Sequence, residues 1–485
     1  MTDLHVRDRL FIGGEWVVPA STDTIDIVSS STEAVIARVT AAGPADVDRA
    51  VAAARVAFDT GPWPSMSPTE RGEVLTRLIA AIAERSNELA DAIAAEVGSP
   101  RKWAKFGQVA IATAVLNVYA NLAGNYRWID ERGGAMGNPI KVHRRSVGVV
   151  GAIVPWNAPL FTAALKLGPA LIAGCTVVLK PAPESALDSF LLADAVEAAG
   201  FPRGVLNIVA ADRGGSERLV RHPDVDKISF TGSTSVGRQI GAICGGDIRR
   251  CTLELGGKSA AILLDDITLD DATIGELVNA GMANNGQVCA AQTRILAPRS
   301  RYAEISDALA TAVRALQVGD AFDPATKIGP LATARQRDRV EGYLAAGVHD
   351  GARAIVGGGR PTGLDRGWFV EPTVFTDATN RMSIAREEIF GPVLTVIPYD
   401  GDEQAVAIAN DSDYGLTGTI WTADIARGEA LANRVRAGVI AFNTSAAMDL
   451  MAPFGGFKLS GIGRECGPEA FESYTEYQTI VLPKS

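Results

Sequence analysis

The segment Phe230-Thr231-Gly232-Ser233-Thr234-Ser235-Val236-Gly237 decides the fold class, because it joins an apolar strand to a helix through a tight Gly-Ser turn. On both sides of it, short apolar strands alternate with helical segments. Such alternation predicts an α/β fold with a parallel, doubly wound sheet, the architecture that binds dinucleotides. The expected strands are Val147–Val154, Thr176–Leu179, Val205–Val209, Lys227–Phe230 and Cys251–Leu255, and the expected helices are Leu160–Ile172, Ser185–Ala198, Ser216–Arg221 and Val236–Ile243.

The turn at Gly232 and Ser233 has two interpretations. The usual GxGxxG dinucleotide fingerprint is absent, so the turn could be an ordinary strand-to-helix connection. It could also hold a pyrophosphate, because the unpaired N–H groups and the dipole at a helix N-terminus both favour an anion.

A second α/β unit follows, with its first strand at Ser259–Leu264. Before the first unit, residues 7–40 are typical of short strands and turns, and Ala45–Phe58 and Pro68–Val97 have the apolar spacing of helices. In the second unit, helices are expected at Leu269–Ala283, Arg301–Leu316, Gln336–Ala346, Glu403–Asn410 and Ile425–Val435, with strands near Ile295, Thr395–Ile397, Gly418–Ile420 and Gly438–Phe442.

Composition excludes several classes of protein. The 485 residues are 47% hydrophobic, which indicates a globular chain of two or three domains. The net charge of −10 argues against a nucleic-acid partner. The uncharged stretch Ser146–Leu165 contains Pro155, Asn157 and Pro159, which disfavour a membrane helix. The five scattered cysteines show no metal-ligand spacing, and no secretory signal is evident, so we expect reduced thiols, no metal site and a cytoplasmic location.

Two further stretches offer reactive side chains. Asn284-Asn285-Gly286-Gln287-Val288-Cys289-Ala290 carries a thiol on a Gly-flanked turn, and Leu253-Glu254-Leu255-Gly256-Gly257-Lys258 carries a carboxylate. A thiol can attack a carbonyl, and a glutamate among apolar residues can have a raised pKa that suits a base. Taken alone, however, Cys289 is more readily interpreted as a small buried hydrophobe, and Glu254 as a strand-end or capping residue.

Together these segments resemble the NAD(P)-dependent aldehyde dehydrogenase superfamily, in order and along essentially the whole chain. Further matching segments are Pro155-Trp156-Asn157, Phe230–Ser233, Glu387–Pro392 and Pro453–Gly461. The resemblance implies an aldehyde dehydrogenase-like α/β fold with a Rossmann-type cofactor domain, a second α/β catalytic domain and a small β oligomerisation element. The implied ranges are 1–122 and 146–254 for the cofactor domain, 255–442 for the catalytic domain, and 123–145 with 470–485 for the oligomerisation strands, while 443–469 returns to the cofactor domain and the substrate entrance.

The same resemblance assigns roles to residues. Cys289 would be the nucleophile, Glu254 the general base, and Asn157 a donor to the oxyanion that forms when the thiol adds to an aldehyde. The implied cofactor contacts are Ile153, Pro155, Trp156, Lys180, Gly232, Ser233, Leu255, Glu388 and Phe390. Pro183 stands where many NAD-preferring relatives carry a carboxylate, so NAD is expected but NADP remains an alternative.

The resulting hypothesis is oxidation of an aldehyde to its acid through a thiohemiacetal and a thioester on Cys289. Apolar residues around Ala446–Met451 suggest a hydrophobic aldehyde, and the family is typically a homodimer or homotetramer. Three alternatives stay open: acyl transfer to coenzyme A, a catalytically silent relative, and a cysteine hydrolase. Relatives that use coenzyme A generally lack the glutamate at position 254, and none of the four histidines lies in a segment expected at the site, which disfavours a hydrolase.

Overall fold

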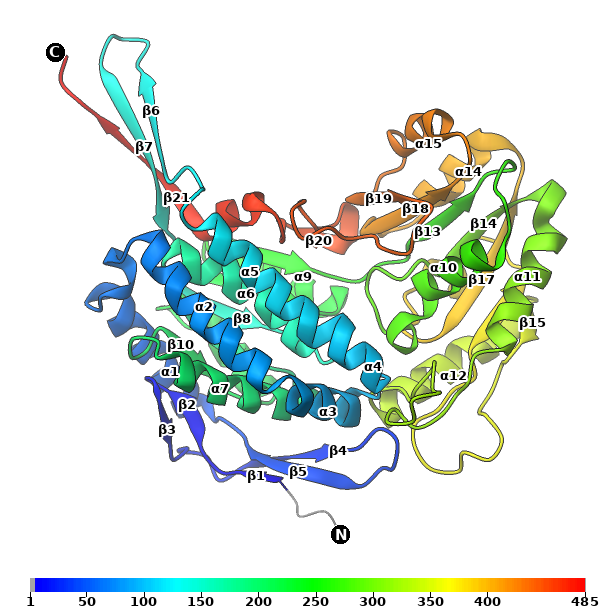
Figure 1. Ribbon diagram of the computed structural model, residues 1–485, viewed down its shortest axis with the longest axis horizontal. Coiled ribbons are helices and arrows are strands. Elements are labelled where there is room, and N and C mark those ends of the chain that lie inside the picture. The colour runs from blue at the N-terminus through cyan, green and yellow to red at the C-terminus, as the bar shows by residue number, and fades with distance from the viewer. Residues whose placement is uncertain (1–4, 485) are drawn as a thin grey trace.

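A computed structural model describes residues 5–484 of the chain. It consists of two α/β lobes and a narrow β extension that projects from the first lobe beside the C-terminus (Figure 1). The α/β fold class expected from the sequence is confirmed.

The first lobe is built on an eight-stranded sheet with the order β20-β12-β11-β8-β9-β10-β2-β3. The strands from β12 to β10 are parallel, as predicted, whereas β20, β2 and β3 add antiparallel edges. The bounds are β2 Leu10–Ile12, β3 Glu15–Val17, β8 Val149–Ile153, β9 Thr176–Lys180, β10 Leu206–Ile208, β11 Lys227–Thr231, β12 Arg250–Glu254 and β20 Gly461–Ile462.

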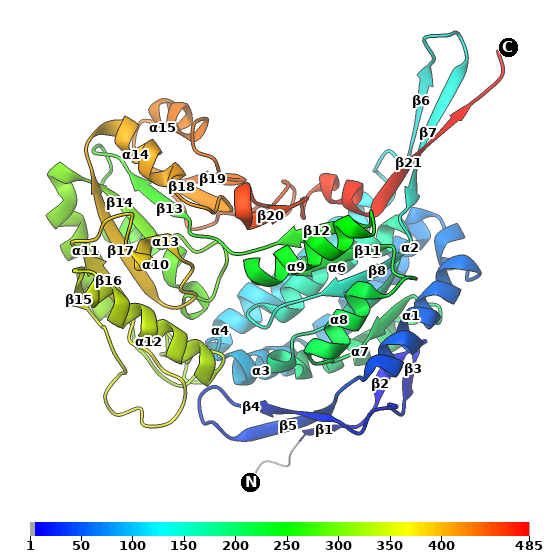
Figure 2. The same cartoon turned by 180° about the vertical axis from the view of Figure 1, so that it is seen from behind.

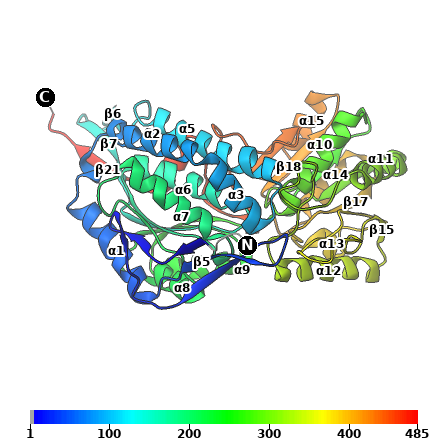
Figure 3. The same cartoon turned by 60° about the horizontal axis from the view of Figure 1, so that its bottom comes forward.

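Helices cover both faces of this sheet (Figure 3). One layer, in front in Figure 1, holds α2 Pro68–Glu84, α3 Ser86–Val97, α5 Ile111–Leu122, α6 Pro159–Ala173 and α7 Leu187–Ala199. The other layer, seen from behind in Figure 2, holds α1 Pro44–Asp59, α8 Arg213–Arg221 and α9 Thr234–Gly246. The buried strands and helices share one large apolar core.

The second lobe contains a seven-stranded sheet with the order β15-β16-β17-β14-β13-β18-β19, parallel except for β15. Its strands are β13 Ala260–Leu263, β14 Arg294–Pro298, β15 Arg353–Val356, β16 Thr373–Thr376, β17 Val393–Tyr399, β18 Thr417–Trp421 and β19 Val439–Phe442. Its helices are α10 Asp271–Met282, α11 Tyr302–Arg314, α12 Ala334–His349, α13 Ser383–Arg386, α14 Gly401–Asn410 and α15 Ile425–Ala432.

Two small sheets complete the molecule. In the extension, β21 Thr475–Val481 pairs with β7 Pro139–Ser146, which pairs with β6 Ile129–Gly133. These strands lie largely within the ranges 123–145 and 470–485 that the resemblance implied for the oligomerisation strands. The N-terminal strands β1 His5–Arg7, β4 Thr24–Val28 and β5 Val35–Thr40 form the other sheet.

The structure corrects three local expectations. Helix α8 begins at Arg213, not Ser216, because the Asp212 side chain caps it by accepting a hydrogen bond from Gly215 N at 2.9 Å. The helical segment expected over 68–97 forms two helices, α2 and α3, which are separated at Arg85. Residues 101–122, for which no element was expected, form α4 Arg101–Trp103, the π-helical turn η2 Ala104–Ala110 and α5.

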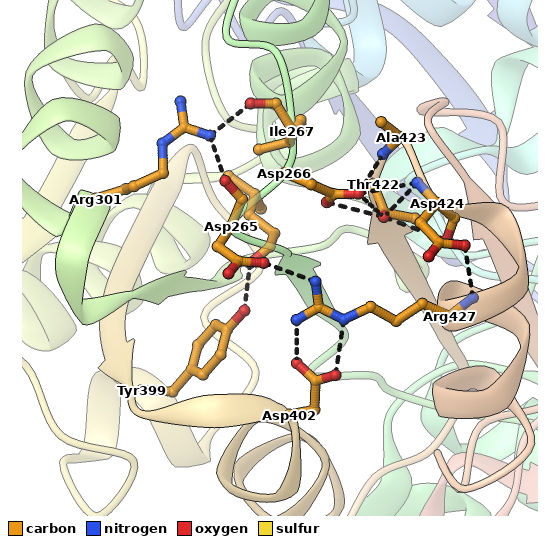
Figure 4. A network of polar contacts seen from close by, with 11 residues as sticks. Asp265, Asp266, Ile267, Arg301, Tyr399, Asp402, Thr422, Ala423, Asp424 and Arg427 are labelled. Atoms are coloured by element: carbon orange, nitrogen blue, oxygen red, sulfur yellow. Dashed lines mark hydrogen bonds and ion pairs between the residues drawn. The ribbon is translucent and has the colours of Figure 1, made fainter.

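A dense polar network fixes the ends of β13, β17 and β18 in the second lobe (Figure 4). Arg427 forms paired hydrogen bonds with Asp402 at 2.8 and 2.6 Å and a third with Asp265 at 2.7 Å. Asp266 accepts hydrogen bonds from the Thr422 hydroxyl and from the backbone N–H of Asp424. The acidic side chains here are thus held by hydrogen bonds and ion pairs, and the network is structural.

Within residues 5–484, no helix combines the length and the apolar character that crossing a bilayer requires. In the same range, no cluster of three or more His, Cys, Asp or Glu side chains is arranged to hold a metal ion.

Candidate active site

The thiol lies on a loop whose backbone is unusual. After α10, Asn284, Asn285 and Gly286 are all left-handed, with φ of 51°, 61° and 72°. A Cβ at Gly286 would lie 2.1 Å from the carbonyl oxygen of Gly391, so only glycine fits there. This tight turn delivers Cys289 to a half-buried position facing the first lobe.

The carboxylate stretch passes directly against the thiol loop. A Cβ at Gly257 would lie 2.3 Å from the backbone oxygen of Cys289, which shows how closely the two backbones approach. Glu254 ends β12, three residues before this contact. Segments about thirty residues apart in sequence therefore meet between the lobes.

Glu254 is a buried carboxylate without a partner. Its side chain is 3% exposed, and neither oxygen has a hydrogen-bond partner among the described residues. Burial, reinforced by the nearby charge of Glu465, raises the pKa of Glu254 well above its usual range. A carboxyl group in this state is suited to take up a proton near neutral pH.

A buried ion pair lies near Glu254. Lys166 of α6 donates hydrogen bonds to Glu465 and to the Thr231 hydroxyl, both at 2.7 Å. Thr231 belongs to the Phe230–Gly237 segment, but Lys166 and Glu465 lie in none of the motifs quoted from the sequence, so the sequence did not identify the ion pair.

The thiol is neutral at rest. Burial, with smaller contributions from the charges of Glu388 and Glu254, raises the pKa of Cys289 to about 12. A thiol with this pKa needs a base before it can attack.

Asn157 follows β8 and lies beside the thiol loop. Its amide nitrogen donates a hydrogen bond to the backbone oxygen of Gln287 at 2.9 Å. An amide nitrogen carries two hydrogens, so one remains for a substrate oxygen. The side chain is buried, which favours a strong interaction with a developing negative charge.

The expected cofactor residues of the first lobe gather at one edge of its sheet. Ile153 is paired with Lys180 and with Phe230, and Thr231 is paired with Glu254. Because these strands are parallel, their carboxyl ends share an edge, which is where α/β sheets bind ligands. Pro155, Trp156, Gly232, Ser233 and Leu255 follow directly from the same strand ends.

The start of α9 fits a pyrophosphate. Ser233 is its N-cap residue but makes no side-chain cap bond, and the first turn contains no acidic residue. The buried Thr234 hydroxyl also has no hydrogen-bond partner in the described part of the chain. The helix therefore offers unpaired donors to an anion.

Glu388 and Phe390 lie on the opposite side of this edge. Glu388 accepts a hydrogen bond from Gly257 N at 3.0 Å, and burial raises the pKa of its carboxyl to about 7. The rings of Trp156 and Phe390 meet edge to face at 5.4 Å. The Gln336 amide donates a hydrogen bond to the backbone oxygen of Phe390 at 2.7 Å, and the Arg339 guanidinium donates one to the backbone oxygen of Glu388 at 2.6 Å.

Apolar residues surround the expected substrate entrance. Leu160 and Leu165 are buried, and Phe161, Met448 and Leu450 are partly buried against the main core. Asp449 is exposed, and its carboxylate accepts a hydrogen bond from Met451 N at 2.8 Å. The Asp449 carboxylate is thus hydrogen-bonded within a local turn.

Comparison with known proteins gives consistent matches over the full length. Residues 16–480 match the model of the aldehyde dehydrogenase family. The chain is 48% identical over 476 residues to geranial dehydrogenase from Castellaniella defragrans, which covers 98% of this chain and 99% of that protein.

Solved structures agree with the sequence matches. An aldehyde dehydrogenase from Mycobacterium tuberculosis in complex with NAD+ superposes with a TM-score of 0.97 at 48% identity, covering 99% of both chains. A mutant of aldehyde dehydrogenase C from Pseudomonas syringae, in complex with NAD+ and octanal, gives a TM-score of 0.94 at 41% identity, covering 98% of this chain and 96% of that one.

Proposed function

The chain belongs to the aldehyde dehydrogenase family, and we propose that it oxidises a hydrophobic aldehyde to the carboxylic acid by covalent catalysis at Cys289. NAD(P)-dependent aldehyde oxidation is the activity of the family. The observation that carries the residue assignment is the approach of Cys289, Glu254 and Asn157, from three distant segments, to one buried place.

In the first half-reaction, the sulfur of Cys289 adds to the aldehyde carbon after its proton passes to a base. Glu254 is the base, directly or through a water molecule, because its buried carboxylate is unpaired and its pKa is raised. The free amide hydrogen of Asn157 and the backbone N–H of Cys289 stabilise the oxyanion of the thiohemiacetal.

In the second half-reaction, Glu254, after it has passed the thiol proton to solvent, takes a proton from water, which attacks the thioester and releases the acid, and the sulfur of Cys289 is the leaving group. Bound NAD(P)+ supplies the hydride acceptor that turns the thiohemiacetal into that thioester. Lys180 and Glu388 would hold the two riboses, the start of α9 the pyrophosphate, and Trp156 and Phe390 would flank the nicotinamide side. The first lobe is then the cofactor domain and the second lobe supplies the nucleophile.

Measurement of NAD(P)H formation with and without coenzyme A tests the fate of the acyl group. We expect full turnover without the thiol and release of free acid. Strict dependence on coenzyme A would instead identify an acylating enzyme and contradict the role of Glu254 in hydrolysis.

The charge around Lys180 supports NAD over NADP. Burial lowers the pKa of Lys180 to about 8, and Glu184 and Asp212 lie close enough to oppose that shift. Two carboxylates beside the lysine disfavour a 2′-phosphate, although Arg335 pairs with Glu184 at 3.1 Å. We expect kcat/KM to be higher with NAD than with NADP.

The apolar entrance supports a hydrophobic aldehyde, and two relatives agree, one named for geranial and one bound to octanal. A panel of aliphatic, aromatic and terpenoid aldehydes would test this. Higher kcat/KM for small polar aldehydes than for long apolar ones would refute it.

We also propose that the protein self-associates, as a homodimer or homotetramer, through the β extension. Tyr477 and Val481 expose 56% and 62% of their surface on β21, and Ile129 exposes 47% on β6. Exposed apolar strands of this kind are typical of interfaces. Light scattering of wild type and Val481→Lys would test it.

The five cysteines are free, which fits a cytoplasmic location.

A further inference from the structure

Gln108 is a buried amide in an unusual turn. It lies in the π-helical turn η2, where its side chain is fully buried although Phe106, two residues earlier, is 61% exposed. A π-turn inserts a residue into a helix and occurs frequently at functional sites. Burial of an amide costs free energy unless the amide is hydrogen-bonded.

The Gln108 amide contacts the backbone of Asn157. Its nitrogen donates to the carbonyl oxygen of Asn157 at 3.4 Å and to the hydroxyl of Ser99 at 3.2 Å. The same Asn157 carbonyl accepts a second hydrogen bond, from the Asn284 amide at 2.9 Å. Two amides from opposite lobes thus hold one carbonyl.

The same hydrogen-bond network includes residues of the loop that carries Cys289. Ser99 donates to the side-chain oxygen of Asn284, and Asn284 adopts the left-handed conformation that begins the Cys289 turn. At its other end, the Asn157 side chain donates to Gln287, two residues before Cys289. Asn157 is therefore fixed at its backbone and at its amide.

We propose that Gln108 is a positioning residue for the oxyanion donor, acting through the backbone of Asn157 together with Ser99 and Asn284. The inference rests on the function proposed above. A hydrogen-bond donor stabilises a transition state only when it is already aimed at the developing charge, because reorientation during the reaction would cost much of the gain. The geometry assigns this role to a side chain that does not itself touch the substrate.

A double-mutant cycle tests the proposal. Gln108→Leu removes the amide at similar volume, and Asn157→Ala removes the donor but leaves the backbone carbonyl. We expect Gln108→Leu to lower kcat roughly tenfold or more, less than the ~10²–10³-fold loss in Asn157→Ala, with the aldehyde KM nearly unchanged. In the Asn157→Ala background, Gln108→Leu should change kcat by less than about twofold, because the donor that it positions is gone.

Equal relative losses of kcat in both backgrounds would overturn the proposal, since they would show that Gln108 acts through general stability. Asn207→Leu is the matched control, because Asn207 is a buried amide of the same lobe that donates to Gly204 O at 2.9 Å. It should lower the unfolding temperature without lowering kcat at a temperature where the variant is folded.

If Gln108→Leu fails to fold, Ser99→Ala replaces it in the same cycle, because Ser99 links Gln108 to Asn284. Failure of the proposed function and failure of the positioning role give different results. If Asn157→Ala itself retains full kcat, the assigned oxyanion donor is wrong; if only Asn157→Ala is slow and Gln108→Leu is not, the positioning role alone is wrong.

Discussion

At high pH, where hydroxide can deprotonate Cys289, replacement of Glu254 by glutamine should stall the enzyme after hydride transfer. The substitution keeps the volume of a side chain that is 3% exposed, so it opens no cavity, but it removes the unpaired carboxylate. A positioned general base contributes ~10²–10⁴-fold, or about 3–5 kcal/mol of the barrier at 1.36 kcal/mol for each factor of ten.

The structure favours the upper part of that range. The neighbouring carboxylate, Glu465, is tied to Lys166 at 2.7 Å and is therefore a poor substitute base. We expect steady-state turnover of Glu254→Gln to fall by roughly 10³-fold or more, while a single turnover of NADH still forms at high pH, where hydroxide can deprotonate Cys289.

Stopped-flow absorbance at high pH, followed by steady-state assay, would separate the two half-reactions. Glu96→Gln is the matched control: Glu96 is fully buried in the same lobe, accepts a hydrogen bond from Leu187 N at 2.7 Å, and plays no part in the site. A loss of less than tenfold in Glu254→Gln, or a loss as large in Glu96→Gln, would refute the reasoning.

Further predictions concern ionisation and cofactor binding. The pKa of Glu254 is raised in the folded state, so the folded protein loses stability as pH rises from the unfolded pKa of ~4.3 towards the folded value. In thermal unfolding, Glu254→Gln should therefore have a higher unfolding temperature than wild type at pH 8 but not at pH 4.5. Alkylation of Cys289 by iodoacetamide without coenzyme should accelerate about tenfold per pH unit between pH 7 and 10, since its pKa is raised to about 12, and a plateau below pH 8 would contradict this. Lys180→Met should weaken NAD binding roughly 10- to 150-fold by calorimetry, the equivalent of ~1.5–3 kcal/mol for a charged hydrogen bond, and unchanged affinity would remove Lys180 from the cofactor site. Burial opposes ionisation of Asp266, but hydrogen bonds from Thr422 and backbone N–H groups lower its pKa overall. The stability that the Asp266 carboxylate contributes is therefore present above the unfolded pKa of ~3.9 and is lost as pH falls through the folded value. Asp266→Asn should be less stable than wild type at pH 7, and the difference in stability should shrink below pH 4.

The sequence predicted the parallel core of the first sheet because its strands are continuous apolar runs between turn residues. It did not predict the antiparallel edge strand β20, since β20 contains only Gly461 and Ile462 and pairs with Leu253 and Glu254, more than two hundred residues earlier in the chain. The π-helical turn at Ala104–Ala110 and the helix α5 that follows it were also missed, since no element was expected over residues 101–122.

The motifs located Cys289, Glu254 and Asn157, but the environment of these residues required the structure. Burial, together with the charge of Glu465 more than two hundred residues away, raises the pKa of Glu254, and the backbone carbonyl of Asn157 accepts a hydrogen bond from Gln108. Such partners lie outside every recognisable motif, because tertiary packing alone brings them together.

Mass spectrometry of the enzyme quenched during turnover tests the central claim most directly. We expect an acyl adduct on the peptide that contains Cys289, with the mass of the aldehyde less two hydrogens, and, at high pH, a larger fraction of it in Glu254→Gln than in wild type. Turnover with no adduct on that sulfur, or with the acyl group on another residue, would contradict it.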